Sequence, residues 1–154
     1  MKHEMRNLKR AISEAGAREL LARGEYGVLS TCGPEGQPYG VPLSYCLLAD
    51  ALYFHCAVAG HKLENIAADS RVSFCVVGRT EVLPEQFATR YESVIVTGRA
   101  AEVFAEDKQQ ALEGLVAKYS PGFQDEGRKY ITAQSGQARV FRITIETITG
   151  KGRP

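Results

Sequence analysis

A glycine, a histidine and a lysine meet where a strand-like pattern gives way to a helical one. The stretch "YFHCAVAGHKLENI", residues 53–66, alternates in its first half and recurs at helical spacing in its second. The first N–H groups of a helix are unpaired and carry partial positive charge, so Gly60, His61 and Lys62 could hold a phosphate. A plain strand-to-helix corner with solvated basic residues is the competing interpretation, and both stay open at this point.

His55 precedes this corner on the predicted strand. It shares a face with Tyr53 and Ala57, and that face leads toward Gly60 and its neighbours. Imidazole changes charge near neutral pH, so His55 could donate a proton to a ligand or contact it. A hydrogen-bonded histidine in the core or at its rim is the alternative.

Polar and aromatic residues open another predicted strand. In "ATRYESVIV", residues 88–96, an apolar run follows Arg90, Tyr91, Glu92 and Ser93. One interpretation is an exposed strand end. The other is an edge that completes a site on a second subunit.

The sequence lacks the motifs of several other kinds of active site. The sequence contains no G-x-S-x-G, no P-loop and no H-E-x-x-H motif. Its three histidines do not combine with acidic residues at metal-ligand spacing, so we expect no metal site. The net charge of +1 gives no overall attraction to nucleic acid. No apolar run reaches the roughly 20 residues of a membrane span. We therefore expect neither a nucleic-acid partner nor a membrane.

The four cysteines lie far apart in strand-like apolar stretches. They are Cys32, Cys46, Cys56 and Cys75, and none forms a C-x-x-C pair. This pattern predicts reduced core thiols in a cytoplasmic protein. Cys32, beside a turn, is the one expected to be partly exposed.

Hydrophobic periodicity and turn residues divide the chain into strands and helices. Predicted strands cover residues 26–32, 38–48, 51–58, 71–78, 91–104 and 138–150. Predicted helices cover residues 14–23, 61–68, 106–119 and 124–134. We expect a hairpin over residues 38–58, a long connection over 81–90, and loose termini at 1–10 and 150–154.

Several single residues add detail to these predicted strands and helices. Ser13 is expected to cap the first helix, and Gly98 to mark a bend or bulge. Pro42 cannot donate to a strand ladder, so we expect it on an edge, at a bulge, or beside something other than a strand. The expected buried stripe of the helix at 61–68 consists of Leu63, Ile66 and Ala67.

The order of elements favours an antiparallel fold. Strands joined by tight turns dominate and helices fill the longer connections, unlike the alternating β-α-β order of a Rossmann sheet. We expect one mainly β domain over residues 1–154, a small antiparallel β-barrel with flanking helices at its ends.

Three ordered stretches resemble a known family. They are "YGVLSTCGPEGQPYGVPLSY", "LYFHCAVAGHKLENIAADSRVSFCVV" and "RYESVIVTGRAAEV". Together they resemble the FMN-binding split-barrel proteins, the pyridoxamine 5'-phosphate oxidase-like family, and most of all its 5-nitroimidazole-resistance (Nim) branch. The resemblance implies a six-stranded antiparallel Greek-key split barrel. It also implies a homodimer with two FMN sites at the subunit interface.

The resemblance also implies cofactor-binding residues. Lys62 matches the basic residue at the junction that grips the FMN phosphate. The strand whose backbone lies beside the isoalloxazine ring matches Val41, Pro42, Leu43 and Ser44. Neighbouring contact positions match Ser30, Thr31, His55, Cys56 and Ala57. The strand offered by the other subunit matches Tyr91, Glu92 and Ser93.

The expected function follows from this resemblance. We expect an FMN-dependent oxidoreductase that reduces a small organic acceptor, as a nitroimidazole reductase does, with His55 or His61 near the open ring face. Non-catalytic binding of FMN or haem is the alternative, and an empty barrel is a third. Pyridoxamine 5'-phosphate oxidation is disfavoured, because residues 149–154 show no clear equivalent of that enzyme's basic residues for the substrate phosphate.

Overall fold

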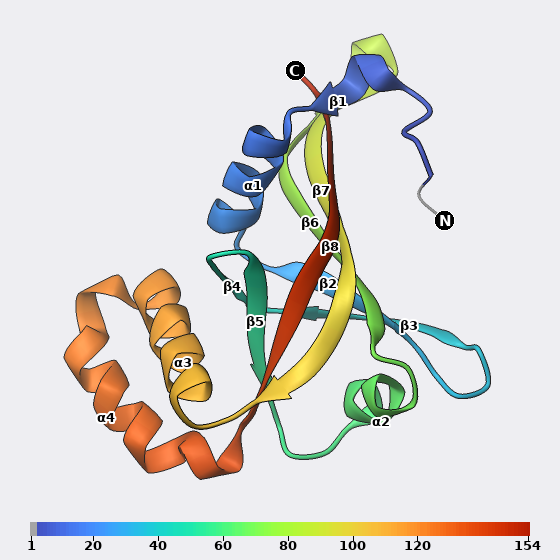
Figure 1. Ribbon diagram of the computed structural model, residues 1–154. Coiled ribbons are helices and arrows are strands. Elements are labelled where there is room, and N and C mark those ends of the chain that lie inside the picture. Colours follow the sequence, from blue (N-terminus) through green and yellow to red (C-terminus); the bar gives the residue numbers. More distant parts are fainter. Residues whose placement is uncertain (1–2) are drawn as a thin grey trace.

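Antiparallel strands form one sheet, and helices flank it (Figure 1). The structure is a computed structural model that describes residues 3–154. The strands are β1 (Ala11–Ile12), β2 (Gly27–Cys32), β3 (Pro38–Leu43), β4 (Cys46–Leu48), β5 (Ala51–Cys56), β6 (Arg71–Leu83), β7 (Ala88–Val103) and β8 (Arg139–Arg153). The α-helices are α1 (Glu14–Arg23), α2 (His61–Ala68), α3 (Ala105–Tyr119) and α4 (Gln124–Gln134). Short 3-10 helices are η1 (Leu8–Arg10), η2 (Pro84–Gln86), η3 (Pro121–Phe123) and η4 (Ser135–Gln137).

The sheet curls until its two edges come close together. The strand order is β3-β2-β6-β7-β8-β5-β4, with β1 added to β8. β3 and β4 are the opposite ends of this order, yet only Ser44 and Tyr45 separate them in the chain. Each Cα step covers only about 3.8 Å, so the two edges must approach each other, although they are not paired in the described sheet. The result is an antiparallel split barrel, as expected, but with eight strands rather than six.

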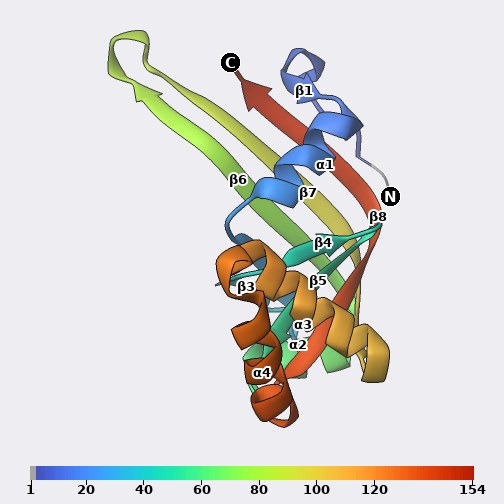
Figure 2. The same cartoon turned by 90° about the vertical axis from the view of Figure 1, so that its left-hand side faces the viewer.

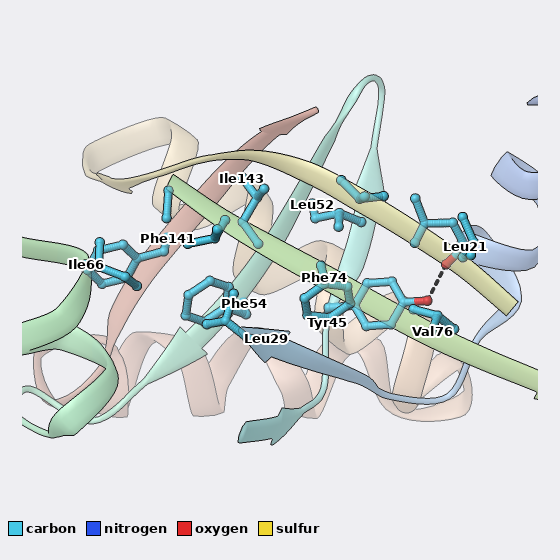
Figure 3. Packing of buried hydrophobic residues seen from close by; sticks show 14 of the residues in the cluster. Leu21, Leu29, Tyr45, Leu52, Phe54, Ile66, Phe74, Val76, Phe141 and Ile143 are labelled. Atoms are coloured by element: carbon cyan, nitrogen blue, oxygen red, sulfur yellow. Dashed lines mark hydrogen bonds between the residues drawn. The ribbon is translucent and has the colours of Figure 1, made fainter. Parts of the chain in front are cut away.

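Tyr45, between these edges in the chain, belongs to the main hydrophobic core (Figure 3). Its fully buried ring lies edge-on to Phe74, with centroids 4.9 Å apart, and its hydroxyl donates to the carbonyl oxygen of Leu21 in α1. Its own carbonyl oxygen accepts from Lys118 and Tyr119 of α3. Burial, and secondarily the Tyr119 phenol, raises the pKa of Tyr45, so the hydroxyl stays a proton donor. Tyr45 thus ties the split in the barrel to α1 through its side chain and to α3 through its backbone.

Alternation along the strands supplies the main core. Leu29, Phe54 and Phe74 point inward from β2, β5 and β6, and their sequence neighbours point outward. The predicted first helix is confirmed, and Ser13 caps it by accepting from the Gly16 N–H at 3.1 Å. The buried face of this helix consists of Ala17, Leu20 and Leu21.

A smaller core lies between the sheet and the pair α3–α4. It consists of Cys46, Val103, Ala111, Leu112, Leu115, Ile131 and Val140. Both helices lie where the sequence predicted them, with α3 beginning one residue earlier at Ala105. None of the helices in the described part of the chain is long and apolar enough to cross a membrane.

The predictions for residues 38–58 are only partly right. The strand expected over residues 38–48 is broken into β3 and β4. β3 pairs with β2, while β4 pairs with β5, so residues 38–58 do not form one hairpin. The break lets Tyr45 cross between the two sheet edges. Pro42 lies on edge strand β3 opposite Val28, which confirms its expected edge position.

The long connection expected over residues 81–90 is also wrong. β6 continues to Leu83 and β7 begins at Ala88, so this region is the end of a long hairpin with η2 at its tip. We call residues 79–92 the arm. A register shift between Val77 and Thr80 marks a β-bulge at its base.

The two ends of the chain are more ordered than expected. β8 runs to Arg153, and its residues 151–153 pair with β7 rather than forming a loose tail. At the other end, η1 and β1 order residues 8–12, while residues 1–2 of the expected loose terminus lie outside the described residues. The bulge expected at Gly98 is confirmed by a register shift between Thr97 and Gly98.

Candidate functional site

The predicted strand-to-helix corner is open toward solvent. β5 ends at Cys56, and α2 begins at His61 with Gly60 as its N-cap. Gly60 has a φ of 151°, which side chains rarely adopt, and a Cβ there would meet nothing within 4 Å. Among residues 3–154 no side chain caps this helix. The N–H of Leu63 donates to the Gly60 carbonyl oxygen at 3.0 Å, which leaves the N–H groups of His61 and Lys62 for a ligand. We call residues 57–62 the α2 corner.

Contacts from β2 and β3 hold α2 in place. The Asn65 Nδ2 group donates to Thr31 Oγ1 at 3.0 Å, and both side chains are buried. The rings of His61 and Tyr39 lie 4.1 Å apart at an angle of 39°. Thr31, a predicted cofactor residue, therefore uses its hydroxyl to dock α2 on the sheet.

Lys62 lies half-buried at the α2 corner, near Cys56. Burial raises the pKa of the Cys56 thiol, and the nearby positive charge of Lys62 partly offsets that rise. Lys62 makes no ion pair with a carboxylate of residues 3–154. Its ammonium group is therefore available to an anion. Ala57, also predicted as a contact, is exposed at the same corner.

The predicted ring-contact strand β3 forms an edge of the sheet. Val41 and Leu43 point inward and pack against the main core, while Pro42 and Ser44 are exposed. In the described sheet, β3 pairs with β2 alone, so the backbone groups along its other side are open to a flat ligand.

The outer face of the sheet is hollowed beside Ser30. This hollow has a volume of about 410 Å3 and lies over β2, β6 and β7. Arg71 and Asp69 line it and pair at 2.6 Å, and this guanidinium lowers the pKa of Asp69 to about 2. One row of hydroxyl groups across β2, β6, β7 and β8 contains Ser30, Ser73, Thr97 and Thr147.

Apolar side chains continue this outer face next to the hydroxyl row. Val28, Val77 and Ile95 are 37%, 56% and 46% exposed, and Cys75 lies between Val28 and Ile95 in the strand register. We call these four residues the outer patch. Several exposed apolar residues on adjoining strands are typical of a surface that another molecule covers.

His55 lines a different hollow. It projects from the face of β5 opposite Phe54 and Cys56, into a hollow of about 330 Å3. Residues of α3 and α4 complete this hollow, among them Leu115 and Tyr130. No described residue of the α2 corner lines it. The two candidate catalytic histidines therefore face different surroundings, and their catalytic roles stay predictions.

Tyr91 and Ser93 lie on β7 at the base of the arm, opposite Arg153 and Lys151 of β8. Figures 1 and 2 show this end of β7 and α2 at opposite ends of the molecule. A single chain therefore does not bring these two residues to the α2 corner. Their predicted contact with the cofactor of a second subunit stays a prediction.

The sequence did not single out Tyr39, Asn65 and Arg71. The ring of Tyr39 packs against His61, Asn65 fixes α2, and Arg71 lines the outer hollow. Asn65 offered one signal, because it is a polar residue between Leu63 and Ile66 of the predicted apolar stripe. The stripe itself is partly wrong, since Ala67 is exposed and Asn65 is buried in its place.

Comparisons with known proteins agree with this architecture. Residues 13–152 match the sequence profile of pyridoxamine 5'-phosphate oxidase. A candidate 5-nitroimidazole antibiotic resistance protein from Bacteroides thetaiotaomicron is similar, with 20% identity, a TM-score of 0.75, and coverage of 98% of this chain and 95% of that chain. A FAD-binding protein from Mesorhizobium loti has 26% identity, a TM-score of 0.68, and coverage of 94% and 98%.

A third solved structure, a FAD and haem binding protein from Mycobacterium smegmatis, has 18% identity and a TM-score of 0.81. It covers 94% of this chain and 73% of that chain. A search of curated proteins found no significant match. The profile match spans nearly the whole chain, so the predicted family is confirmed: the chain belongs to the pyridoxamine 5'-phosphate oxidase family.

Proposed function

We propose that this protein is a flavoprotein that binds FMN, with the phosphate at the α2 corner. The observation that carries the proposal is the open N-terminus of α2 beside Lys62, which makes no ion pair with a carboxylate of residues 3–154. Free N–H groups and a nearby ammonium group form charge-assisted hydrogen bonds to phosphate. The name of the FAD-binding relative supports flavin binding in this fold.

The residues around the α2 corner fit the rest of such a cofactor. The open edge of β3 offers backbone groups around Val41 and Leu43 to the ring, and Pro42 presents no N–H there. The hydroxyl of Ser30 lies on the outer face beside the hollow. When bound, the flavin supplies the redox chemistry, and these residues orient it.

A homodimer is part of this proposal. The outer patch exposes apolar surface on β2, β6 and β7, and a second copy of the chain would cover it. Tyr91 and Ser93 are remote from the α2 corner of their own chain, so they would serve the cofactor of the other subunit. Each FMN would then lie between two subunits.

The proposed reaction is reduction of a small organic acceptor, such as a nitroimidazole. The relative with a name from nitroimidazole resistance supports this choice. The competing function is binding of FMN or haem without turnover, which the FAD and haem binding relative supports. We also propose a cytoplasmic location, because the four cysteines are free thiols.

One set of measurements tests the flavin proposal. We expect the purified protein to show flavin absorbance and a dimeric mass in solution. Added FMN should raise the melting temperature of any cofactor-free fraction. Oxidation of NADPH with a nitroimidazole acceptor would then separate an enzyme from a binder. A haem spectrum, or a protein whose melting temperature does not respond to FMN, would contradict the proposal.

A further inference from the structure

A larger cleft lies at the other end of the molecule from the α2 corner. It has a volume of about 830 Å3, where the arm, β1 and the end of β8 gather (Figures 1 and 2). We call it the arm cleft. Small-molecule sites typically measure roughly 300–1,000 Å3, so a nucleotide-sized ligand fits this space.

Basic side chains outnumber acidic ones in the arm cleft. The basic residues are Lys9, Arg10, Arg79, Arg90 and Arg153, and the acidic residues are Glu81 and Glu92. They come from η1, β6, β7 and β8, so only the folded chain brings them together. The whole chain carries a net charge of +1, which makes this a local concentration of positive charge.

Both acidic side chains already have partners. Glu81 accepts from Arg90 at 2.9 Å. Glu92 accepts from Arg23 at 2.8 Å and from the backbone N–H of Arg79 at 3.0 Å. Four basic side chains of the cleft make no ion pair with a carboxylate of residues 3–154: Lys9, Arg10, Arg79 and Arg153.

The β-bulge in β6 carries one of these side chains. The register shift between Val77 and Thr80 leaves Gly78 and Arg79 in the bulge. A Cβ at Gly78 would clash with the Glu92 carboxylate, so the glycine lets that carboxylate approach the backbone N–H of Arg79. The guanidinium of Arg79 lines the cleft and makes no ion pair with a carboxylate of residues 3–154.

We propose that the arm cleft binds a small phosphorylated molecule of nucleotide size through its phosphate groups. Guanidinium groups bind phosphate with short, often bidentate hydrogen bonds. A long nucleic acid is disfavoured, because the net charge of +1 leaves it little attraction outside the cleft. The inference rests on one subunit and does not depend on flavin binding.

Calorimetric titration with ADP tests this inference, with adenosine as the uncharged match. We expect ADP, and not adenosine, to bind the FMN-loaded protein. Arg79→Ala and Arg153→Ala should each weaken ADP binding about tenfold or more, because each removes a charge-assisted hydrogen bond. Arg153→Lys should retain part of the ADP affinity that Arg153→Ala loses. Arg128→Ala is the control, since Arg128 lies on α4 and pairs with Asp125 outside the cleft.

Four outcomes would overturn the inference. The first is that ADP does not bind, and the second is that the Arg79→Ala and Arg153→Ala variants bind ADP as tightly as wild type does. The third is that free FMN displaces ADP, and the fourth is that a single-stranded RNA binds more tightly than ADP. The third would mean that the cleft belongs to the flavin site. Melting temperatures of the variants check that each protein is folded. Flavin absorbance of the same samples keeps this test separate from that of FMN binding.

Discussion

The α2 corner and the arm cleft both concentrate positive charge, but the chain builds them differently. At the α2 corner, Gly60, His61 and Lys62 are neighbours in the sequence, and the start of one helix is enough to orient them. The arm cleft instead combines η1 and β1 with β6, β7 and β8, and it exists only after the long hairpin has paired with β8. Local spacing therefore predicted the first region, whereas the second depends on contacts between distant parts of the chain.

The largest expected effect comes from placing a charge in the outer patch. Ile95→Glu would bury an unpaired carboxylate in the proposed dimer interface, at a cost of several kcal/mol. We expect the dimer dissociation constant to rise by a factor of about 100 or more. FMN affinity should fall with it, because Tyr91 and Ser93 would no longer reach the other subunit. ADP binding in the arm cleft should not change.

Analytical ultracentrifugation of the Ile95→Glu protein measures the first of these effects. Phe123→Glu is the matched control, because Phe123 is 64% exposed on η3, away from the outer patch. A variant that stays fully dimeric would remove the outer patch from the proposal.

The next largest effect concerns the α2 corner, through the hydrogen bond that holds α2 on the sheet. Asn65→Leu removes the donor that binds Thr31 and leaves a buried hydroxyl without a partner. We expect the free energy of unfolding to fall by about 1–3 kcal/mol, and FMN affinity to fall as α2 loosens. The measurement is chemical denaturation, with FMN titration of the same sample.

The double variant Thr31→Val with Asn65→Leu sharpens this test. With both polar groups gone, no hydroxyl is left unpaired, so the loss should be smaller than the sum of the two single losses. Strictly additive losses would mean that this hydrogen bond does not hold α2 on the sheet.

A smaller effect concerns the arm. The Arg79 backbone N–H, and next the Arg23 side chain, lower the pKa of Glu92. A lowered pKa in the folded state stabilises the protein above the ordinary glutamate pKa of about 4.3. This stability is lost as the pH falls through the lower folded value. Glu92→Gln should therefore cost about 1 kcal/mol at pH 7 and flatten the fall in stability below pH ~4.3.

Denaturation curves at a series of pH values measure this difference between wild type and Glu92→Gln. Parallel stability profiles for the two proteins would contradict the role of Glu92 in fixing the bulge.

The smallest effect is expected at Tyr39. Tyr39→Leu removes the ring that packs against His61 but keeps an apolar side chain on β3. Pairs of aromatic rings contribute about 0.5–1.5 kcal/mol, so FMN affinity should fall by a factor of roughly 2 to 10. An unchanged affinity would mean that this ring contact does not position the start of α2.

Sequence patterns predicted the parts of the fold that local physics determines. Pro42 indicated an edge strand and Gly98 a bulge, and both are confirmed. The break at Tyr45 could not be predicted, because its hydroxyl acceptor, the carbonyl of Leu21, is distant in the sequence. The arm was missed because polar residues and Pro84 between β6 and β7 resemble a loop.

The same distinction applies to the candidate site. Lys62 was predicted from its position at the start of a helix, and it lies there. Asn65 was missed because its partner Thr31 lies on β2, far away in the chain. The face of β5 that carries His55 was expected to lead to the corner, but it borders a hollow that α3 and α4 complete.

FMN affinity of a Lys62→Met protein tests the central claim most directly. Methionine keeps much of the length of the side chain and removes its charge, and Lys129→Met on exposed α4 is the matched control. If Lys62 binds the phosphate, FMN affinity falls about tenfold or more in the first variant and not in the second, with both proteins folded. If Lys62→Met binds FMN as tightly as wild type does, the α2 corner is not the phosphate site.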